Sequence, residues 1–351
     1  MRVAIEAASL GLSSGGLARY TSQLSLALAR AYADEEFYLI SDQQFAMPAG
    51  APPNLKRGTT PHNAIERRWW LWGMARELSR IGADVVHGPD FAVPYLPRRA
   101  SVMTLHDLSP WLDPAWHDGA GRVMRRTPLL LKMGLATMVI TPGEHVRQEA
   151  IAHFQISPDR VVAVPEAAAD WFAPVETRPA APYFLFVGTV EPRKNLPLLV
   201  EAWRAVRERQ PAVELLIVGR RRADGPEIAE QPGLRLLGEV PDAELPALYS
   251  GATAFVYPSL YEGFGLPVLE AMQCGACVIA SPALSETAGN AAVYAGNARE
   301  LVQAMLDALE RPEWRAEWSA RSRARAAEFS WRRTARETYA VYEEARRRFG
   351  K

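Results

Sequence analysis

The sequence has few cysteines, no net charge and no long apolar run, and each absence excludes a class of protein. Its two cysteines, Cys274 and Cys277, do not complete a zinc site. Forty Lys and Arg residues balance forty Asp and Glu residues, so composition gives no general argument for binding nucleic acid. No apolar run approaches the roughly 20 residues that span a bilayer.

Two further segments, the N-terminal string and the C-x-x-C pair, argue against export and against redox chemistry. The N-terminal string MRVAIEAASL places Glu6 inside its apolar run and lacks the layout of a signal peptide, so we expect a cytoplasmic protein. The C-x-x-C pair follows the helical run LPVLEAMQ, whereas a redox pair is expected at a helix N-terminus. We therefore interpret both cysteines as structural.

The order of apolar segments predicts an α/β protein with two domains. A length of 351 residues suits two domains of ordinary size. In the first half, strand-like runs at 3–8, 37–41, 84–88, 101–107, 138–143 and 161–166 are each followed by loop or helix signals. Strands that alternate with helices indicate a parallel sheet covered on both faces.

The second half repeats this alternation of strands and helices after a proline-rich linker between Pro165 and Pro182. Strands are predicted at 183–188, 213–219, 234–240, 252–258 and 277–281, with helices at 196–209, 242–250 and 266–273. We predict two Rossmann-like domains facing a cleft, covering residues 1–170 and 171–331. A last helix over 332–351 is free in this scheme to pack back on the first domain.

The segment Tyr257–Ala280, YPSLYEGFGLPVLEAMQCGACVIA, holds the strongest chemical signal. A strand ends there, and a glycine loop leads to a helix with Pro267 at its first position, where proline is well tolerated. Free N–H groups of Gly265, Leu266 and Val268 would then face an anion such as phosphate. Glu270 is expected in the first turn, where a carboxylate can accept both hydroxyls of a ribose. A helix-capping acid beside a glycine turn is the structural alternative.

The segment FVGTVEPRKNLPLLVEAW, residues 186–203, places two adjacent cations before a helix. Arg193 and Lys194 at a cleft edge can neutralise a departing nucleoside diphosphate, which is essential where no metal does so. No D-x-D pair occurs among the twelve aspartates, which argues against a metal-dependent architecture. We therefore expect no metal and no cofactor. A solvated pair of charges at a helix start is the alternative for this segment.

The string from Tyr257 to Ala280, with its E-x7-E spacing of Glu262 and Glu270, resembles the signature of the retaining GT-B glycosyltransferases of family 4. The G-T-x-E-x-R-K-N string is similar to strings in mannosyltransferases of that family, although many members have Arg where this chain has Thr189. The resemblance implies that Glu262 lies by the transferred sugar and that Glu270 binds the ribose. The implied donor-binding set is Gly188, Thr189, Arg193, Lys194, Val240, Glu262, Gly263, Phe264, Gly265, Leu266 and Glu270.

Two segments of the first half are candidates for the acceptor side of the cleft. Glycines between the first strand and its helix can cradle phosphate or admit an acceptor, and the resemblance assigns Gly15 and Gly16 to the floor of the cleft. His106 and Asp107 end a buried strand, where ligands of such sheets bind. The family has a histidine near the donor sugar at this position, so His106 joins Arg193 and Lys194 in the expected catalytic set, with Glu262. A satisfied structural histidine is the alternative, and His87 is a weaker candidate.

Residues 67–76, RRWWLWGMAR, and 122–132, RVMRRTPLLLK, mix cations with large apolar side chains. Such patches can rest on an anionic lipid surface, and a lipid-linked acceptor would bring the protein to the inner face of the membrane. Trp and Leu at helical spacing also fit the protein core, so both interpretations stay open.

The resemblance implies a retaining glycosyltransferase, and the missing D-x-D pair favours one that is independent of metal. Its donor would be a nucleotide sugar, with GDP-mannose favoured over a UDP-sugar, and its acceptor a saccharide or lipid-linked saccharide in polysaccharide or glycolipid synthesis. The alternatives are a sugar-nucleotide epimerase of the same fold and a non-catalytic two-domain sugar-binding protein. The epimerase would need further acids, and the binding protein leaves Arg193 and Lys194 unexplained.

Overall fold

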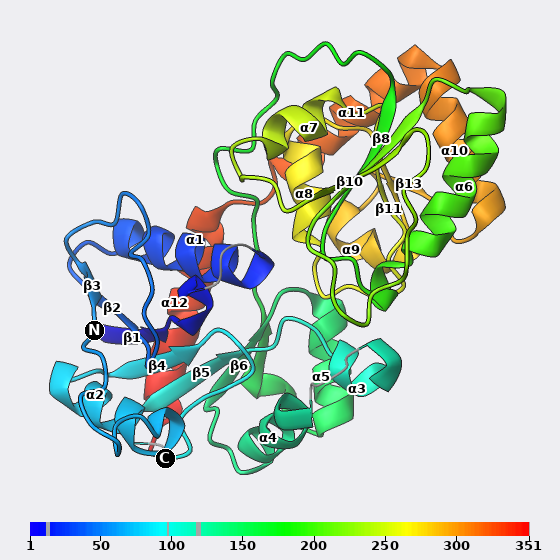
Figure 1. The fold of residues 1–351 in the computed structure, drawn as a ribbon. Coiled ribbons are helices and arrows are strands. Elements are labelled where there is room, and N and C mark those ends of the chain that lie inside the picture. The colour runs from blue at the N-terminus through cyan, green and yellow to red at the C-terminus, as the bar shows by residue number, and fades with distance from the viewer. Residues whose placement is uncertain (12–14, 97, 117–120, 351) are drawn as a thin grey trace. The chain divides into compact units, whose positions relative to one another are not determined.

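A computed structural model describes residues 1–11, 15–96, 98–116 and 121–350 (Figure 1). The chain divides into two compact units. Unit 1 comprises Met1–Leu112, Gly119–Glu166 and Ser330–Lys351, and unit 2 comprises Asp113–Asp118 and Ala167–Phe329. The chain therefore passes from unit 1 to unit 2 after Glu166 and returns after Phe329. The short piece that begins at Asp113 belongs to unit 2, which the sequence pattern does not indicate.

Unit 1 is built on a parallel sheet of seven strands in the order β3-β2-β1-β4-β5-β6-β7. Because β1 and its neighbours are buried on both faces, these strands are nearly continuous apolar runs. The strands are β1 (Arg2–Glu6), β2 (Glu36–Ile40), β3 (Leu55–Arg57), β4 (Val85–Gly88), β5 (Ala100–Thr104), β6 (Met138–Thr141) and β7 (Val161–Ala163).

Helices cover both faces of this sheet. They are η1 (Ala8–Gly11), α1 (Gly16–Ala31), η2 (Trp69–Gly73), α2 (Met74–Ile81), α3 (Ser109–Leu112), α4 (Gly121–Lys132), α5 (Glu144–Phe154), η4 (Pro158–Arg160) and α12 (Trp331–Arg348). Helix α12, red in Figure 1, runs among the blue and cyan elements of unit 1 and packs on α1, β5 and β6.

Helix α12 is fastened to unit 1 by polar contacts as well as by packing. Ser330 accepts a hydrogen bond from the Arg333 N–H at the start of the helix, as an N-cap residue does. The Thr334 hydroxyl donates to the Pro165 carbonyl at 2.7 Å, which joins the two places where the chain leaves and re-enters unit 1. Farther along, Tyr339 stacks on Tyr32 with ring centroids 3.7 Å apart.

Unit 2 repeats the plan with a parallel sheet of six strands in the order β10-β9-β8-β11-β12-β13. The strands are β8 (Tyr183–Val187), β9 (Glu214–Val218), β10 (Leu234–Gly238), β11 (Ala254–Tyr257), β12 (Val278–Ala280) and β13 (Val293–Tyr294). The helices are η3 (Pro114–Trp116), η5 (Pro192–Lys194), α6 (Leu196–Arg209), α7 (Leu245–Gly251), α8 (Leu266–Gln273), η6 (Pro282–Leu284), α9 (Ser285–Ala288), α10 (Ala298–Glu310) and α11 (Pro312–Ala326).

The predicted class, two α/β units on parallel sheets, is confirmed. Helices α6 and α8 have the predicted bounds, whereas most predicted strands run one to three residues too far at an end. Within the described ranges, no helix is both long and apolar enough to cross a membrane.

Candidate functional site

The loop before α8 folds as the glycine pattern indicates, but its details differ from the prediction. Gly265 has φ +88°, and a Cβ there would lie 2.2 Å from the Leu284 side chain, so only glycine fits this position. The helix begins at Leu266, so Pro267 is its second residue. The Val268 N–H donates to the Gly265 carbonyl at 2.9 Å, so the prediction that it is free was wrong.

The two predicted cations meet the first glutamate of the E-x7-E pair. The Lys194 ammonium donates to Glu262 Oε1 and, at 2.9 Å, to the Tyr257 hydroxyl. The Arg193 guanidinium donates through Nη1 to Glu262 Oε2 at 3.2 Å and to the Tyr261 carbonyl at 2.8 Å. All three charged side chains are buried, so this is a desolvated ion-pair cluster and not a solvated charge pair at a helix start.

A second acid extends the cluster. Glu191 accepts from Arg193 Nη2 at 2.9 Å and from Arg222 Nη1 at 2.6 Å. Arg222 in turn donates through Nε to Asp224 at 2.8 Å. Cations and carboxylates therefore alternate from Lys194 to Asp224 at the carboxyl ends of β8 and β9, the edge where ligands of parallel sheets bind.

The electrostatics of the cluster keep Glu262 ionised. Burial alone would raise its pKa, but the charges of Lys194 and Arg193 outweigh burial and hold the pKa of Glu262 at about 2. Burial and the neighbouring Arg193 lower the pKa of Lys194, and the charge of Glu262 only partly offsets them. An anion that entered beside Lys194 would relieve the repulsion between the two cations.

Glu270 is more completely buried than the charged residues of this cluster. It is in the second turn of α8, not the first, and its side chain is fully buried. The Tyr249 hydroxyl of α7 donates to its Oε2 at 3.0 Å. A ribose diol therefore reaches this carboxylate only when neighbouring side chains move.

The other predicted donor residues lie around the same sheet edge. Gly188 follows β8, and a Cβ there would be 3.4 Å from the Tyr257 hydroxyl that binds Lys194. Thr189 and Gly263 are half-buried, and Val240 packs against the core of unit 2. Phe264 is buried, and its carbonyl accepts a hydrogen bond from the Thr287 hydroxyl.

In unit 1, the glycine loop leads into α1. Gly15 has φ +122°, which favours glycine, and apart from its chain neighbours no atom of the described residues lies within 4 Å of a Cβ built there. Gly15 and Gly16 are both exposed. The rest of the predicted loop, residues 12–14, lies outside the described residues.

His106 follows β5 and has an acceptor at each ring nitrogen. Nδ1 lies 3.0 Å from Glu166 Oε1, and Nε2 lies 2.8 Å from the Pro89 carbonyl. Burial alone lowers the pKa of His106, but the hydrogen bond and charge of Glu166 raise it above its ordinary value. Asp107, the next residue, accepts from the N–H and the hydroxyl of Ser109 and so holds the start of α3.

His87, the weaker candidate, is part of a buried network of hydroxyl groups. Its Nδ1 lies 2.7 Å from the Tyr342 hydroxyl of α12 and its Nε2 lies 2.8 Å from the Thr104 hydroxyl. The Thr104 hydroxyl is also 3.1 Å from that of Tyr20. Burial lowers the pKa of His87 to about 3, so this ring is neutral at physiological pH.

Cys274 and Cys277 are buried and free, as a structural role predicts, and burial raises the pKa of each thiol to about 12.

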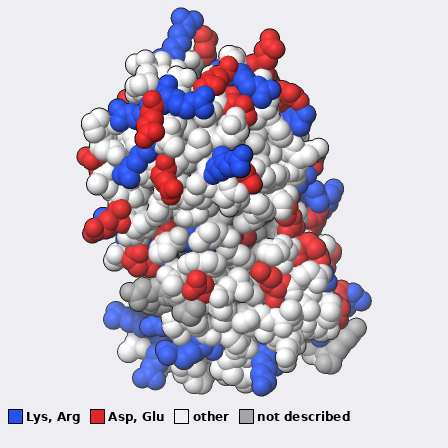
Figure 2. Space-filling model, turned by 90° about the vertical axis from the view of Figure 1, so that its right-hand side faces the viewer, with Lys and Arg blue, Asp and Glu red and all other residues white. Residues whose placement is uncertain are grey.

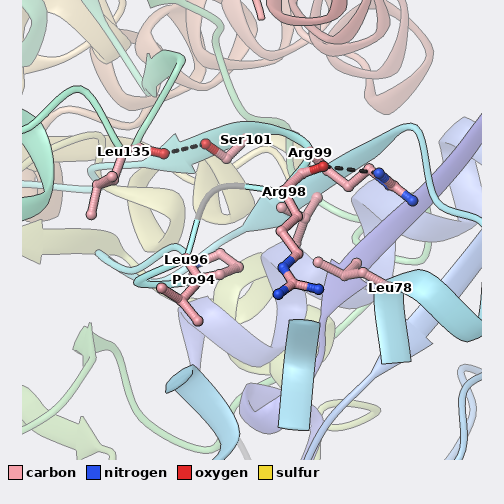
Figure 3. Close-up of a pocket in the computed structure, with 8 residues that line it drawn as sticks. Leu78, Pro94, Leu96, Arg98, Arg99, Ser101 and Leu135 are labelled. Atoms are coloured by element: carbon pink, nitrogen blue, oxygen red, sulfur yellow. Dashed lines mark hydrogen bonds between the residues drawn. The ribbon is translucent and has the colours of Figure 1, made fainter. Parts of the chain in front are cut away.

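A shallow depression of about 180 Å³ lies in unit 1 between α2 and the amino ends of β4 and β5 (Figure 3). Leu78, Arg98 and Ser101 are among its lining residues, and none of the predicted site residues is.

Two acids that bind predicted catalytic side chains, Glu191 at Arg193 and Glu166 at His106, were not among the predicted site residues. Glu191 stands two residues before Arg193 in the quoted string, and its position beside two cations was a signal that could have found it. Glu166 closes a predicted strand at the start of the linker. Tyr257 and Tyr249 gave no signal, because a buried tyrosine hydroxyl looks like any apolar core position in sequence.

Two family models match most of the chain. The model described as Glycosyltransferase Family 4 matches residues 14–168, and the one described as Glycosyl transferases group 1 matches residues 181–311. The chain is 33% identical to the O-antigen chain mannosyltransferase B of Escherichia coli over 281 residues, 74% of each chain.

A second relative and a solved structure are also similar. The chain is 29% identical to the serotype-specific mannosyltransferase WbdA of Escherichia coli over 262 residues, 67% of this chain but only 32% of that protein. The structure of sucrose-phosphate synthase from Thermosynechococcus elongatus matches with a TM-score of 0.71, at 20% identity, over 98% of each chain. That likeness supports the GT-B fold.

Proposed function

The chain belongs to the family 4 glycosyltransferases, and on this premise we propose that it moves mannose from GDP-mannose to a saccharide, free or lipid-linked, in polysaccharide or glycolipid synthesis. The observation that carries the proposal is the buried cluster of Lys194, Arg193 and Glu262 beside the glycine loop of α8. Its chemistry fits a donor with a charged leaving group. The mannosyltransferases among the relatives support the sugar.

In the proposed reaction the bond from the anomeric carbon to the β-phosphate oxygen breaks as the acceptor hydroxyl attacks from the same face. The departing phosphate takes the hydroxyl proton, so the configuration at the anomeric carbon is retained. The positive charges of Lys194 and Arg193 stabilise the negative charge that develops on the departing diphosphate. Glu262 positions the sugar, the backbone of Gly263–Leu266 binds phosphate, and Glu270 binds the ribose.

The experiment first identifies the donor. A thermal-shift panel of GDP, UDP, ADP, dTDP and their sugars should show the largest rise with GDP-mannose. At a hundred times Kd the ligand stabilises the protein by about 2.7 kcal/mol, so a rise in Tm of roughly 5 °C or more is expected. A larger shift with UDP-sugars would replace the proposed donor.

Transfer from GDP-mannose to an oligomannose acceptor should proceed equally with and without excess EDTA, because Lys194 and Arg193 supply the positive charge. Proton NMR of the product should show the axial anomeric configuration of the donor. Loss of transfer in EDTA that added Mg²⁺ restores would overturn metal independence, and an inverted product would overturn retention.

We also propose that unit 1 rests on an anionic membrane surface. The sequence did not decide whether the large apolar side chains of segments 67–76 and 122–132 lie in the core or on the surface. In the structure, each segment has some that are buried and some that are exposed. Trp69, Leu130 and Leu131 are buried, whereas Leu71 and Trp72 are 41% and 47% exposed. On α4 and just after it, Leu129 and Met133 are 52% and 61% exposed.

The exposed side chains of α4 share one face. Arg122, Arg125, Leu129 and Lys132 recur at three- and four-residue spacing, and the helix sequence GRVMRRTPLLLK contains no carboxylate. Figure 2 shows several Lys and Arg side chains and few Asp or Glu side chains along the lower edge of that view. Cations that flank exposed apolar side chains suit the boundary between lipid headgroups and acyl chains.

Segments η2 and α4 are neighbours, so they form one surface. The Arg126 guanidinium lies 5.1 Å from the centre of the Trp70 ring. The Trp70 carbonyl accepts from the Tyr95 N–H at 3.1 Å, and the Thr127 hydroxyl donates to the Phe91 carbonyl at 2.9 Å. We call this surface, formed by the exposed side chains of 65–72 and 122–133, the basic–apolar face.

Co-sedimentation with vesicles tests the basic–apolar face. Binding to phosphatidylglycerol vesicles should exceed binding to phosphatidylcholine vesicles and fall at high salt. Reversing Arg122 and Arg125 to Glu should weaken it at least about thirtyfold, since each basic residue contributes about 1 kcal/mol at such a surface. The control is Arg321→Glu with Leu236→Ser in unit 2. Equal binding by the reversed variant, or a dimer that uses this face without vesicle binding, would overturn the proposal.

A further inference from the structure

His106 has acceptors at both ring nitrogens, which constrains its protonation. The Pro89 carbonyl only accepts, so Nε2, 2.8 Å away, carries a proton. Glu166 Oε1 lies 3.0 Å from Nδ1, and an ionised carboxylate also only accepts. The proton between Nδ1 and Glu166 therefore decides whether the pair is ionic or neutral.

The surroundings favour the ionic pair. A carboxyl group is ordinarily a stronger acid than an imidazolium by about two pKa units, so the proton belongs on the ring unless burial reverses the order. Glu166 is buried, but the His106 side chain is 21% exposed, which lowers the cost of charge on the ring. Asp90, after β4, adds a second negative charge that favours the imidazolium.

Among the described residues, the other polar groups near His106 have different partners. Tyr20 of α1 packs edge-on, with ring centroids 4.7 Å apart at 88°, and its hydroxyl is engaged by Thr104. His87 is neutral. Asp107 turns its carboxylate to Ser109. His87 in β4 and His106 after the neighbouring β5 are thus held in different protonation states, neutral and cationic, by different neighbours.

We infer that Glu166 is a positioning residue that holds His106 as a doubly protonated imidazolium, so that His106 takes part in transfer as a fixed positive charge and not as a base. The inference rests on the proposed function only in placing His106 at the reaction. With both N–H groups engaged, the ring contributes a fixed positive charge and its shape at the carboxyl end of β5.

Histidine-selective ¹H–¹⁵N spectra test the protonation directly. At pH 7.5 both His106 nitrogens should appear as imidazolium, with the signals assigned by their loss in His106→Asn. Glu166→Gln should convert the ring to a singly protonated form at that pH. The matched control is Glu149→Gln, because Glu149 forms an exposed pair with His145 at 3.2 Å and its loss should leave His106 unchanged.

The pH profile of kcat/KM tests the role in transfer. Removing an adjacent carboxylate lowers a histidine pKa by about one to two units, so the alkaline limb in Glu166→Gln should move to lower pH by that amount. If this variant does not fold, Glu166→Asp should keep the imidazolium signals and the wild-type limb. Neutral His106 in the wild type, or an unmoved limb in Glu166→Gln, would overturn the inference. An imidazolium in a protein that uses no nucleotide sugar would instead reject only the proposed function.

Discussion

Lys194→Ala and Arg193→Ala are each expected to lower kcat by about a hundredfold or more. A preorganised group that opposes charge developing in a transition state contributes about this much in a desolvated site. Both cations are buried and lie within hydrogen-bonding distance of Glu262, so solvent screens them little. Steady-state transfer from GDP-mannose at saturating donor measures the effect.

Matched variants separate this electrostatic role from folding. Lys56→Ala and Arg178→Ala remove a lysine and an arginine from exposed ion pairs, and each should leave kcat within about twofold, since surface pairs contribute little. Tm of the two site variants is compared with these controls. Wild-type kcat in both Lys194→Ala and Arg193→Ala would show that the cluster serves only the fold.

The second large effect is on stability. Glu262→Gln should lower the free energy of unfolding at pH 7 by about 3–5 kcal/mol, because it leaves two buried cations without their shared counter-charge. Urea denaturation measures the loss, and Glu201→Gln on the exposed side of α6 should change stability by less than about 0.5 kcal/mol. A loss no larger than the control's would mean that water or Glu191 compensates the cations.

The Glu262 carboxylate also determines how the stability of the protein changes with pH. The folded pKa of Glu262 is about 2, against an ordinary value of 4.5, which corresponds to about 3 kcal/mol of stability. This contribution is fully present above pH 4.5 and is lost as the pH falls toward 2. The stability of the wild type should therefore decline more steeply below pH 4.5 than that of Glu262→Gln. Parallel declines would contradict a depressed pKa.

The sequence predicted the sheets and the donor loop well because these depend on local patterns. Buried parallel strands are continuous apolar runs, and the bounds of α8 follow from Gly265 before it, Pro267 in its first turn and the cysteine turn after it. Strand ends were less accurate, since pairing with a neighbour, and not residue type, decides where β5 stops at Thr104.

Partnerships between distant residues could not be predicted. Nothing in the string EPRKN shows that Arg193 and Lys194 share one glutamate 68 or more positions away, because that depends on how β8 and β11 lie side by side. The burial of Glu270 could not be predicted either. Its spacing from Glu262 was clear, but its burial behind Tyr249 depends on the packing of α7 against α8.

The return of the chain to unit 1 has a consequence for its biogenesis. Most of unit 2, Ala167–Phe329, is an insertion between β7 and α12, and α12 leaves the ribosome only after all of unit 2 has been made. Until then the first sheet lacks the helix that covers β5 and β6 and that supplies the Tyr342 hydroxyl to His87. Unit 1 therefore cannot finish folding during synthesis of its own first 166 residues, and no continuous fragment of the chain without unit 2 contains it whole.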